Sequence, residues 1–215
     1  MKSARPNYSR AVLRKGTPDE NGFRGWHNRG YLPHYDVRGA TQFITFRLVD
    51  SLPESRRNEW ALLLRIEDDR ERRAKLEEYL DRGHGASQLK RPEIAELMAD
   101  TLQSFDGERY ELKSWVVMPN HVHLLVRITN MPMEKMLHSW KRHAALEANK
   151  ILKRRGAFWE REYWDTRIRD NEHFSRAVNY IEENPVKGGL VVRSWDWPWG
   201  SAFERAQTAK AAAEI

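Results

Sequence analysis

Apolar residues fall into three short runs and into four longer stretches with helical spacing. Residues 42–49 alternate apolar and polar side chains and are rich in β-branched and aromatic residues, which predicts a strand. Two apolar runs at 112–118 and 121–128 flank a Pro-Asn turn and predict the strands of a hairpin. A further short strand is expected between 158 and 169, where aromatic residues lie among charges.

The helical pattern predicts four helices. Apolar residues at i, i+3, i+4 and i+7 favour amphipathic helices, and the expected ranges are 53–82, 92–105, 132–155 and 171–184. The first helix is expected to end at Gly83 and the third at Gly156, while Pro185 is expected to end the fourth before it. Strands mixed with helices in this way predict an α+β fold.

The chain is expected to form one domain with extensions. Residues 1–38 are basic, aromatic and rich in Gly, Pro and Asn without a regular period, which predicts an extended N-terminal arm. Residues 39–204 are assigned to the domain, and 54–105 to a helical insertion within it. The Ala- and Lys-rich residues 205–215 are expected to form a flexible tail.

Composition favours a polyanionic partner and a reducing compartment. The 215 residues carry a net charge of +6, a calculated pI near 9.6 and nine tryptophans that can stack on bases as well as fill a core. The absence of cysteine excludes disulfides and thiolate metal sites. With no apolar leader or membrane-length run in the sequence, the expected location is cytoplasmic and nucleoid-associated.

Two histidines stand just after the Pro-Asn turn. Side chains alternate along a strand, so His121 and His123 point to the same face, roughly 7 Å apart along the chain. Two imidazoles on one face can share a metal ion. Alone, such a pair is more often two polar residues on a half-exposed strand.

The last predicted helix offers a second part of a site. At about 100° per residue, Tyr180 and Asn184 lie one turn apart on the flank of the apolar stripe. One hypothesis is that His121, His123 and Asn184 hold a divalent cation while Tyr180 faces the phosphate that the cation polarises. A tyrosine at the edge of a core and an asparagine before a proline also have purely structural explanations.

Several motifs resemble the REP-associated tyrosine transposases, which are single-tyrosine transposases of the HUH type. Pro119-Asn120-His121-Val122-His123 resembles their His, hydrophobe, His motif. The run 179–190, from Asn179 to Leu190, resembles their nucleophile helix, and segments at 29–34, 158–169 and 197–201 are similar as well. The resemblance extends over about residues 26–204.

This resemblance implies a fold, a reaction and a substrate. The fold would be ferredoxin-like, with an antiparallel sheet and helices packed on one face. Tyr180 would be the nucleophile that forms a 5′-phosphotyrosine, and His121, His123 and Asn184 would bind Mg²⁺ or Mn²⁺. The substrate would be single-stranded or hairpin DNA carrying repetitive extragenic palindromic (REP) sequences, which the protein cleaves and rejoins. Monomer and homodimer remain equally open.

Basic and aromatic residues supply candidate DNA contacts. Those expected in the arm, on the third helix and after the last helix are Arg24, Trp26, Arg29, Tyr31, Lys141, Arg142 and Lys187.

Other functions remain open beside this one. A catalytically silent protein that only recognises REP hairpins would keep the same surface. Relaxases usually place the tyrosine before the histidines, and replication initiators have lysine at the position of Asn184. A phosphoesterase with paired histidines typically needs a second His-containing motif. Tyr163 is a second nearby tyrosine, but it lacks an asparagine four residues later.

Overall fold

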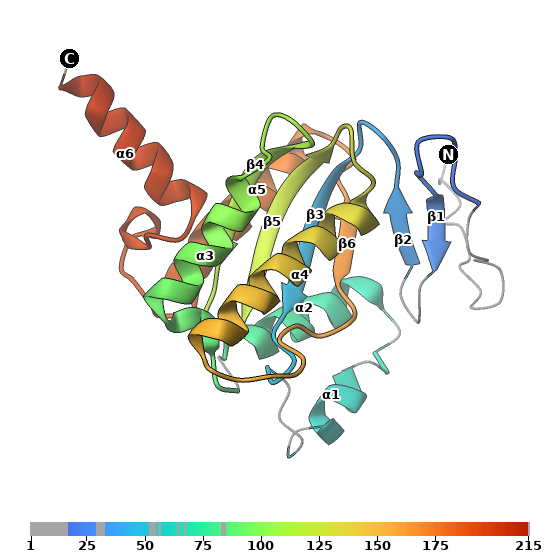
Figure 1. The fold of residues 1–215 in the computed structure, drawn as a ribbon, viewed down its shortest axis with the longest axis horizontal. Coiled ribbons are helices and arrows are strands. Elements are labelled where there is room, and N and C mark those ends of the chain that lie inside the picture. Colours follow the sequence, from blue (N-terminus) through green and yellow to red (C-terminus); the bar gives the residue numbers. More distant parts are fainter. Residues whose placement is uncertain are drawn as a thin grey trace.

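The computed structural model describes residues 17–28, 33–51, 55, 57–63, 65–66, 68–82 and 85–214. Helices and strands follow each other in the order shown in Figure 1. They are β1 (Gly25–Asn28), β2 (Pro33–Asp36), β3 (Thr41–Arg47), α1 (Arg57–Leu63), α2 (Asp69–Asp81), η2 (Gln88–Lys90), α3 (Pro92–Gln103), β4 (Tyr110–Val117), β5 (His121–Ile128), α4 (Met133–Ile151), β6 (Trp164–Arg167), α5 (Asn171–Lys187), η3 (Ser194–Asp196) and α6 (Ser201–Ala213).

The main sheet has the ferredoxin-like arrangement. Its strand order is β4-β5-β3-β6, and each neighbouring pair is antiparallel. Apart from α1, α2 and η2, which lie between β3 and α3, the order along the chain is β3, α3, β4, β5, α4, β6. The two β-α-β units β3-α3-β4 and β5-α4-β6 thus follow each other and are joined by the β4–β5 hairpin. The predicted fold class is confirmed.

The strands divide their side chains between two different environments. On β3, Ile44 and Phe46 join the large core, while Phe43 packs in a second cluster on the opposite face. On β5, Leu124 belongs to the large core and Leu125 to the second cluster. This alternation is what places His121 and His123 on the second face, with Leu125.

Helices cover both faces of the sheet. In Figure 1, α3 and α4 lie in front of the sheet, and their apolar stripes fill the large core. Helix α5 lies on the other face, where Ala177 and Ile181 pack against Phe43, Val116 and Leu125. The sequence predicted helices on one face of the sheet. The structure has α5 on the opposite face as well, which is the face that carries His121 and His123.

The N-terminal region is more regular than its sequence indicates. Strands β1 and β2 form a two-stranded antiparallel sheet with His27 opposite His34. His34 Nδ1 lies 2.5 Å from Asp165 Oδ1 of β6, and the Tyr35 amide donates to Asp165 Oδ2. Buried polar groups, rather than an apolar period, fix this hairpin, so periodicity did not reveal it.

The predicted helix over 53–82 is two helices in the structure, α1 and α2. The Asp68 carboxylate accepts a hydrogen bond from the Glu71 amide at 2.8 Å and so caps the start of α2. The third helix of this region, α3, packs into the large core through Ile94, Met98 and Leu102.

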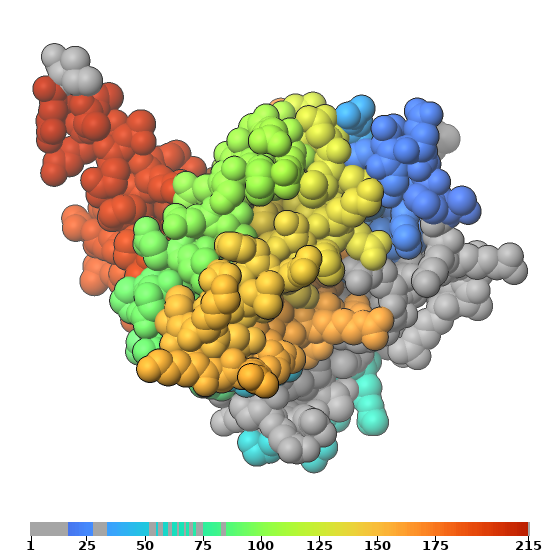
Figure 2. Space-filling model, viewed as in Figure 1, coloured from blue at the N-terminus to red at the C-terminus, as the bar shows by residue number. Residues whose placement is uncertain are grey.

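The C-terminal region differs from the sequence pattern in two places. Helix α5 continues through Pro185 to Lys187, because the helical bonds resume when the Gly188 amide donates to the Asn184 carbonyl. Residues 201–213 form α6, which projects from the body in Figure 2. Before α6, the Trp199 carbonyl and the Ser201 hydroxyl accept hydrogen bonds from the Val117 and Trp115 amides, which closes the outer edge of β4.

None of the helices in the described ranges is both long enough and apolar enough to cross a bilayer.

Candidate active site

The two histidines of β5 face each other in a closed site. Neither His121 nor His123 has any exposed surface. Their Nε2 atoms are 3.0 Å apart, and their ring planes are nearly perpendicular. The strand alternation therefore brings both imidazoles to one point, as the sequence spacing indicates.

Their outer nitrogens are oriented by neighbouring side chains. The Asn120 amide nitrogen donates to the Leu80 carbonyl at 3.1 Å, so Asn120 Oδ1 faces His121 Nδ1 at 2.7 Å. That oxygen can only accept, which places the proton on Nδ1 and leaves the lone pair of His121 on Nε2. Thr45 Oγ1 lies 2.7 Å from His123 Nδ1 and can hold the second ring in the same way.

Burial keeps both imidazoles neutral. It lowers the pKa of His121 to about 3, and it lowers the pKa of His123 well below the usual value. The charges of His121 and Lys187 lower the pKa of His123 further. Neutral imidazole is the form that binds metal, so both rings are available as ligands across the neutral pH range.

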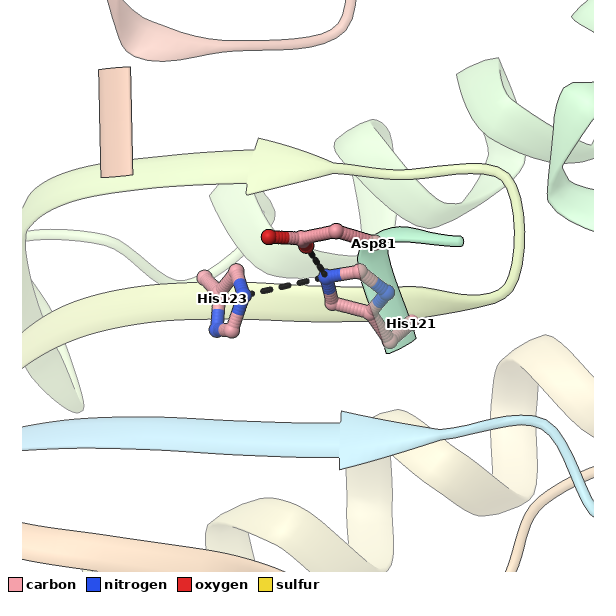
Figure 3. Close-up of side chains that lie close together, drawn as sticks. All are labelled: Asp81, His121 and His123. Carbon is pink, nitrogen blue, oxygen red and sulfur yellow. Dashed lines mark hydrogen bonds and ion pairs between the residues drawn. The ribbon is translucent and has the colours of Figure 1, made fainter. Parts of the chain in front are cut away.

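A third candidate ligand comes from α2. Asp81 Oδ1 lies 3.8 Å from His121 Nε2, and one ligand atom from each of Asp81, His121 and His123 lies within 4.8 Å of the others. Figure 3 shows the three side chains facing one space. Asp81 Oδ1 is buried and makes no hydrogen bond to the described residues. Its sequence context, the end of a charged helix, gave no sign of this position.

Asn184 on α5 faces the same region. It has no exposed surface, and neither atom of its amide makes a hydrogen bond within the described residues. The amide nevertheless lies close enough to lower the pKa values of both Asp81 and Tyr180. Buried amides are normally paired, so the unpaired oxygen fits a metal ligand.

Tyr180 lies one helical turn before Asn184 and packs against the histidine pair. Its ring centroid is 5.4 Å from that of His123 and 5.8 Å from that of Phe43, both in edge-to-face contacts. Lys187 Nζ lies 4.7 Å from the centroid of the tyrosine ring. The structure thus gathers Tyr180, Asn184 and the two histidines although more than fifty residues separate His123 from Tyr180 in the sequence.

Electrostatics keep the phenol protonated in this conformation. Burial raises the pKa of Tyr180 above the usual value of 10, and the charges of Glu77 and Asp81 raise it further. Burial also raises the pKa of Asp81 to about 6, against the lowering effects of Lys187 and Asn184. The site therefore combines carboxylate and amide oxygens with two imidazoles, and this donor set suits a divalent metal ion.

The candidate DNA contacts lie in three separate places. Arg24 and the partly exposed Trp26 are on the hairpin side, where Arg24 pairs with Glu134 at 3.7 Å. Arg29 and Tyr31 are outside the described residues.

Helix α4 carries two more of these residues, and α5 carries the last. Lys141 donates to the carbonyls of Glu160 and Arg161, whereas the side chain of Arg142 is exposed. Lys187 is beside the candidate site itself. Of the five candidates that the structure describes, only Lys187 lies beside the histidine pair.

Part of the chain that contains this site matches a known protein family. Residues 86–184 match the family model described as "Transposase IS200 like". This range begins after α2 and contains His121, His123, Tyr180 and Asn184.

Relatives were found among curated proteins and solved structures. A REP-associated tyrosine transposase of Escherichia coli K12 is 29% identical over 102 residues, which are 45% of this chain and 56% of that protein. A Haemophilus influenzae protein that carries the same family name is 28% identical over 123 residues, 52% of this chain and 69% of that protein. A solved REP-associated tyrosine transposase bound to a REP hairpin has 21% identity and a TM-score of 0.48, covering 82% of this chain and 84% of that one.

Proposed function

We propose that the chain is an IS200-like tyrosine transposase that cleaves and rejoins single-stranded DNA at REP-type hairpins through a 5′-phosphotyrosine intermediate. The convergence of Tyr180 with His121, His123 and Asn184 is the observation that carries this proposal. The relatives' names supply the DNA class, since they are REP-associated.

The proposed metal site consists of residues whose donor atoms converge on one space. His121 Nε2, His123 Nε2 and the Asn184 amide oxygen are the proposed ligands, and their oxygen and nitrogen donors suit Mg²⁺ or Mn²⁺. A divalent ion held there would neutralise charge on the phosphate and act as a Lewis acid. Asn120 and Thr45 keep the lone pairs of the two imidazoles directed inwards.

Tyr180 is the proposed nucleophile. Its hydroxyl oxygen forms a bond to the phosphorus, and the bond from phosphorus to the 3′ oxygen of the preceding nucleotide breaks. The phenol proton passes to solvent, and the 3′ oxygen takes up a proton to leave as a hydroxyl. The ammonium group of Lys187, next to the tyrosine ring, is placed to offset the negative charge of the incoming phosphate.

Rejoining follows by the reverse reaction. A 3′ hydroxyl attacks the phosphotyrosine, the bond between phosphorus and Tyr180 breaks, and the phenol regains its proton. The phosphotyrosine conserves the energy of the original phosphodiester bond, so rejoining the DNA strands needs no nucleoside triphosphate. A resident hydroxyl nucleophile thus allows strand transfer instead of hydrolysis.

A second candidate function is that of a silent REP-binding protein. It is favoured by the closed state of the site, because the histidines and Asn184 have no exposed surface. The two functions differ in whether a covalent bond to DNA forms.

A denaturing gel separates these functions. Labelled single-stranded REP DNA is incubated with the protein and Mg²⁺ or Mn²⁺. The transposase proposal expects cleavage and a slower-migrating covalent adduct, both lost in Tyr180→Phe, which lacks only the hydroxyl. A silent binder gives a native-gel shift without either product. A hydrolase gives cleaved DNA without an adduct, and this outcome would refute the tyrosine mechanism.

A further inference from the structure

Helix α2 closes the candidate site from the side opposite the sheet. Its last turn supplies Asp81, and its Leu80 carbonyl accepts a hydrogen bond from Asn120, the residue that orients His121. Next to the site, between α2, β3 and β6, lies a cavity of about 10 Å³, lined by Leu76, Glu77, Leu80 and four residues of the two strands. Such a space holds at most one water molecule.

A DNA phosphate does not fit this closed state. The proposed ligands His121, His123 and Asn184 all have no exposed surface. A phosphodiester with its flanking sugars is many times larger than a water molecule. The DNA backbone can therefore reach the histidine pair only after α2 has moved, and Asp81 moves with it.

Helix α2 is held less firmly than the helices of the core. Its described side chains contribute Leu76, Tyr79 and Leu80 as buried apolar residues, and the first two form a small separate cluster with Leu63 and Trp164. By contrast, α3 buries six residues in or beside the large core. Elements with few buried apolar contacts open at a lower free-energy cost than the rest of a domain.

Asp81 provides the second link between α2 and the site. Its Oδ1 atom is buried 3.8 Å from His121 Nε2 and makes no hydrogen bond within the described residues. A cation bound by the two histidines would be in reach of this carboxylate, and the bond would join α2 to β5. The negative charges of Glu77 and Asp81 also lie close enough to Tyr180 to disfavour its ionisation while α2 is closed.

We propose that α2 is an autoinhibitory lid latched by the metal ion: in the absence of DNA, Asp81 occupies the ligand position that the DNA phosphate takes when the lid opens. This rests on the proposed function, because it assumes the histidine metal site and a DNA substrate. A carboxylate and a phosphodiester are both anionic oxygen ligands, so one can replace the other at a hard divalent ion. The histidines remain on β5 and keep the ion in both states.

The first test measures metal binding by the full chain without DNA. Mn²⁺ is titrated calorimetrically into the wild type, Asp81→Asn and Glu78→Gln. Asp81→Asn is expected to weaken Mn²⁺ binding at least tenfold, because it removes the anionic ligand and keeps the side-chain shape. Glu78→Gln is the matched control, since it removes an exposed carboxylate of α2 that pairs with Lys75 and Arg82. Equal affinity in Asp81→Asn and wild type would overturn the latch.

The second test follows hydrogen exchange in peptides from α2. Mn²⁺ is expected to slow exchange of α2 in the wild type and in Glu78→Gln but not in Asp81→Asn. Adding single-stranded REP DNA to the Mn²⁺-loaded Tyr180→Phe protein should then speed exchange of α2 again. If DNA slows it further, α2 closes on the substrate and the autoinhibitory role is wrong. Exchange in β5 reports whether each variant is folded, and Asp81→Ala, which also removes the anionic ligand, replaces Asp81→Asn if that variant does not fold.

The third test loosens the lid without touching the proposed ligands. Leu76→Ala removes part of the small cluster and is expected to raise the initial cleavage rate severalfold while it speeds exchange of α2. A cleavage rate that falls with faster α2 exchange would contradict the lid. If the wild type shows the α2 responses to Mn²⁺ and DNA but forms no covalent adduct, the proposed function fails and the lid stands. If it forms the adduct without these responses, only the lid fails.

Discussion

At the scale of single residues, the site depends on a few hydrogen bonds that set where protons lie. Asn120 donates to the Leu80 carbonyl, and this fixes which of its atoms meets His121. Thr45 plays the corresponding part for His123 from the neighbouring strand, where the two residues are directly paired. The shared orientation of the two histidines could be predicted from the sequence, because strand alternation alone puts both rings on one face. The roles of Asp81 and Thr45 beside them could not be predicted, since these residues come from other elements and belong to no motif.

Thr45→Val tests the orienting role directly. Valine keeps the volume of threonine but cannot hydrogen-bond His123 Nδ1, so the ring loses its fixed tautomer. Loss of such an outer partner typically lowers metal affinity by about 10–100-fold. Calorimetric Mn²⁺ titration measures the change. Thr166→Val on β6 is the control, because the buried Thr166 hydroxyl makes no hydrogen bond within the described residues. Unchanged Mn²⁺ affinity in Thr45→Val would contradict the assignment.

At the scale of elements, polar contacts decide several features that apolar periodicity could not show. The hairpin of β1 and β2 is fixed to β6 by His34 and Asp165, and to α4 by Asp36, whose Oδ1 accepts a hydrogen bond from the Met133 amide at 2.9 Å. The run 1–38 lacks an alternating apolar pattern, so the sequence predicted an extended arm. The amphipathic helices α3, α4 and α5 were predicted within a few residues because their apolar stripes face a sheet.

Asp36 makes hairpin docking dependent on pH. Burial is the main cause that raises its pKa from 3.8 to about 6, and the charges of Glu134 and Asp165 add to the effect. Between these values the unfolded chain releases a proton that the folded protein retains. The contribution of Asp36 to stability therefore falls as pH rises through this window, by at most about 3 kcal/mol.

Asp36→Asn removes this titration and keeps an oxygen that accepts from Met133. Relative to the wild type, the variant is expected to gain up to about 3 kcal/mol in free energy of unfolding from about pH 4 to pH 7. Urea unfolding at several pH values measures the difference. The other titratable groups are present in both proteins, so the comparison isolates the contribution of Asp36. A constant difference across this range would show that Asp36 does not titrate as described.

At the scale of the whole molecule, the fold places the candidate active site on one face of the sheet and the candidate DNA contacts Arg142 and Trp26 away from it. The second face of the sheet holds the histidines, α5 and Lys187, whereas Arg142 lies on α4, which covers the opposite face. Trp26 is on the hairpin next to the β6 edge, and its ring lies 4.9 Å from that of Tyr35. The net charge of +6 indicated a polyanionic partner, but only coordinates show that these residues do not form one continuous patch.

Two substitutions distinguish a phosphate contact from base stacking. Arg142→Ala is expected to weaken binding to all DNA sequences alike and to reduce the salt slope of the affinity by about 1. Trp26→Ala is expected to cost about 1–3 kcal/mol of binding with an unchanged salt slope. Fluorescence anisotropy over a series of salt concentrations measures both, and Lys210→Ala on the exposed end of α6 serves as the charge control. Point substitutions suit this test better than deletion of 1–38, because His27, His34 and Asp36 are buried in the fold.

Mass spectrometry of the protein–DNA adduct measures the central step most directly. The full chain is incubated with single-stranded REP DNA and Mn²⁺, digested with nuclease and protease, and searched for a nucleotide attached to the peptide that contains Tyr180. The convergence of phenol, imidazoles and amide predicts a 5′-phosphate linkage on Tyr180 and no adduct in Tyr180→Phe. An adduct on Tyr163 or another residue, or cleavage without any adduct, would contradict it.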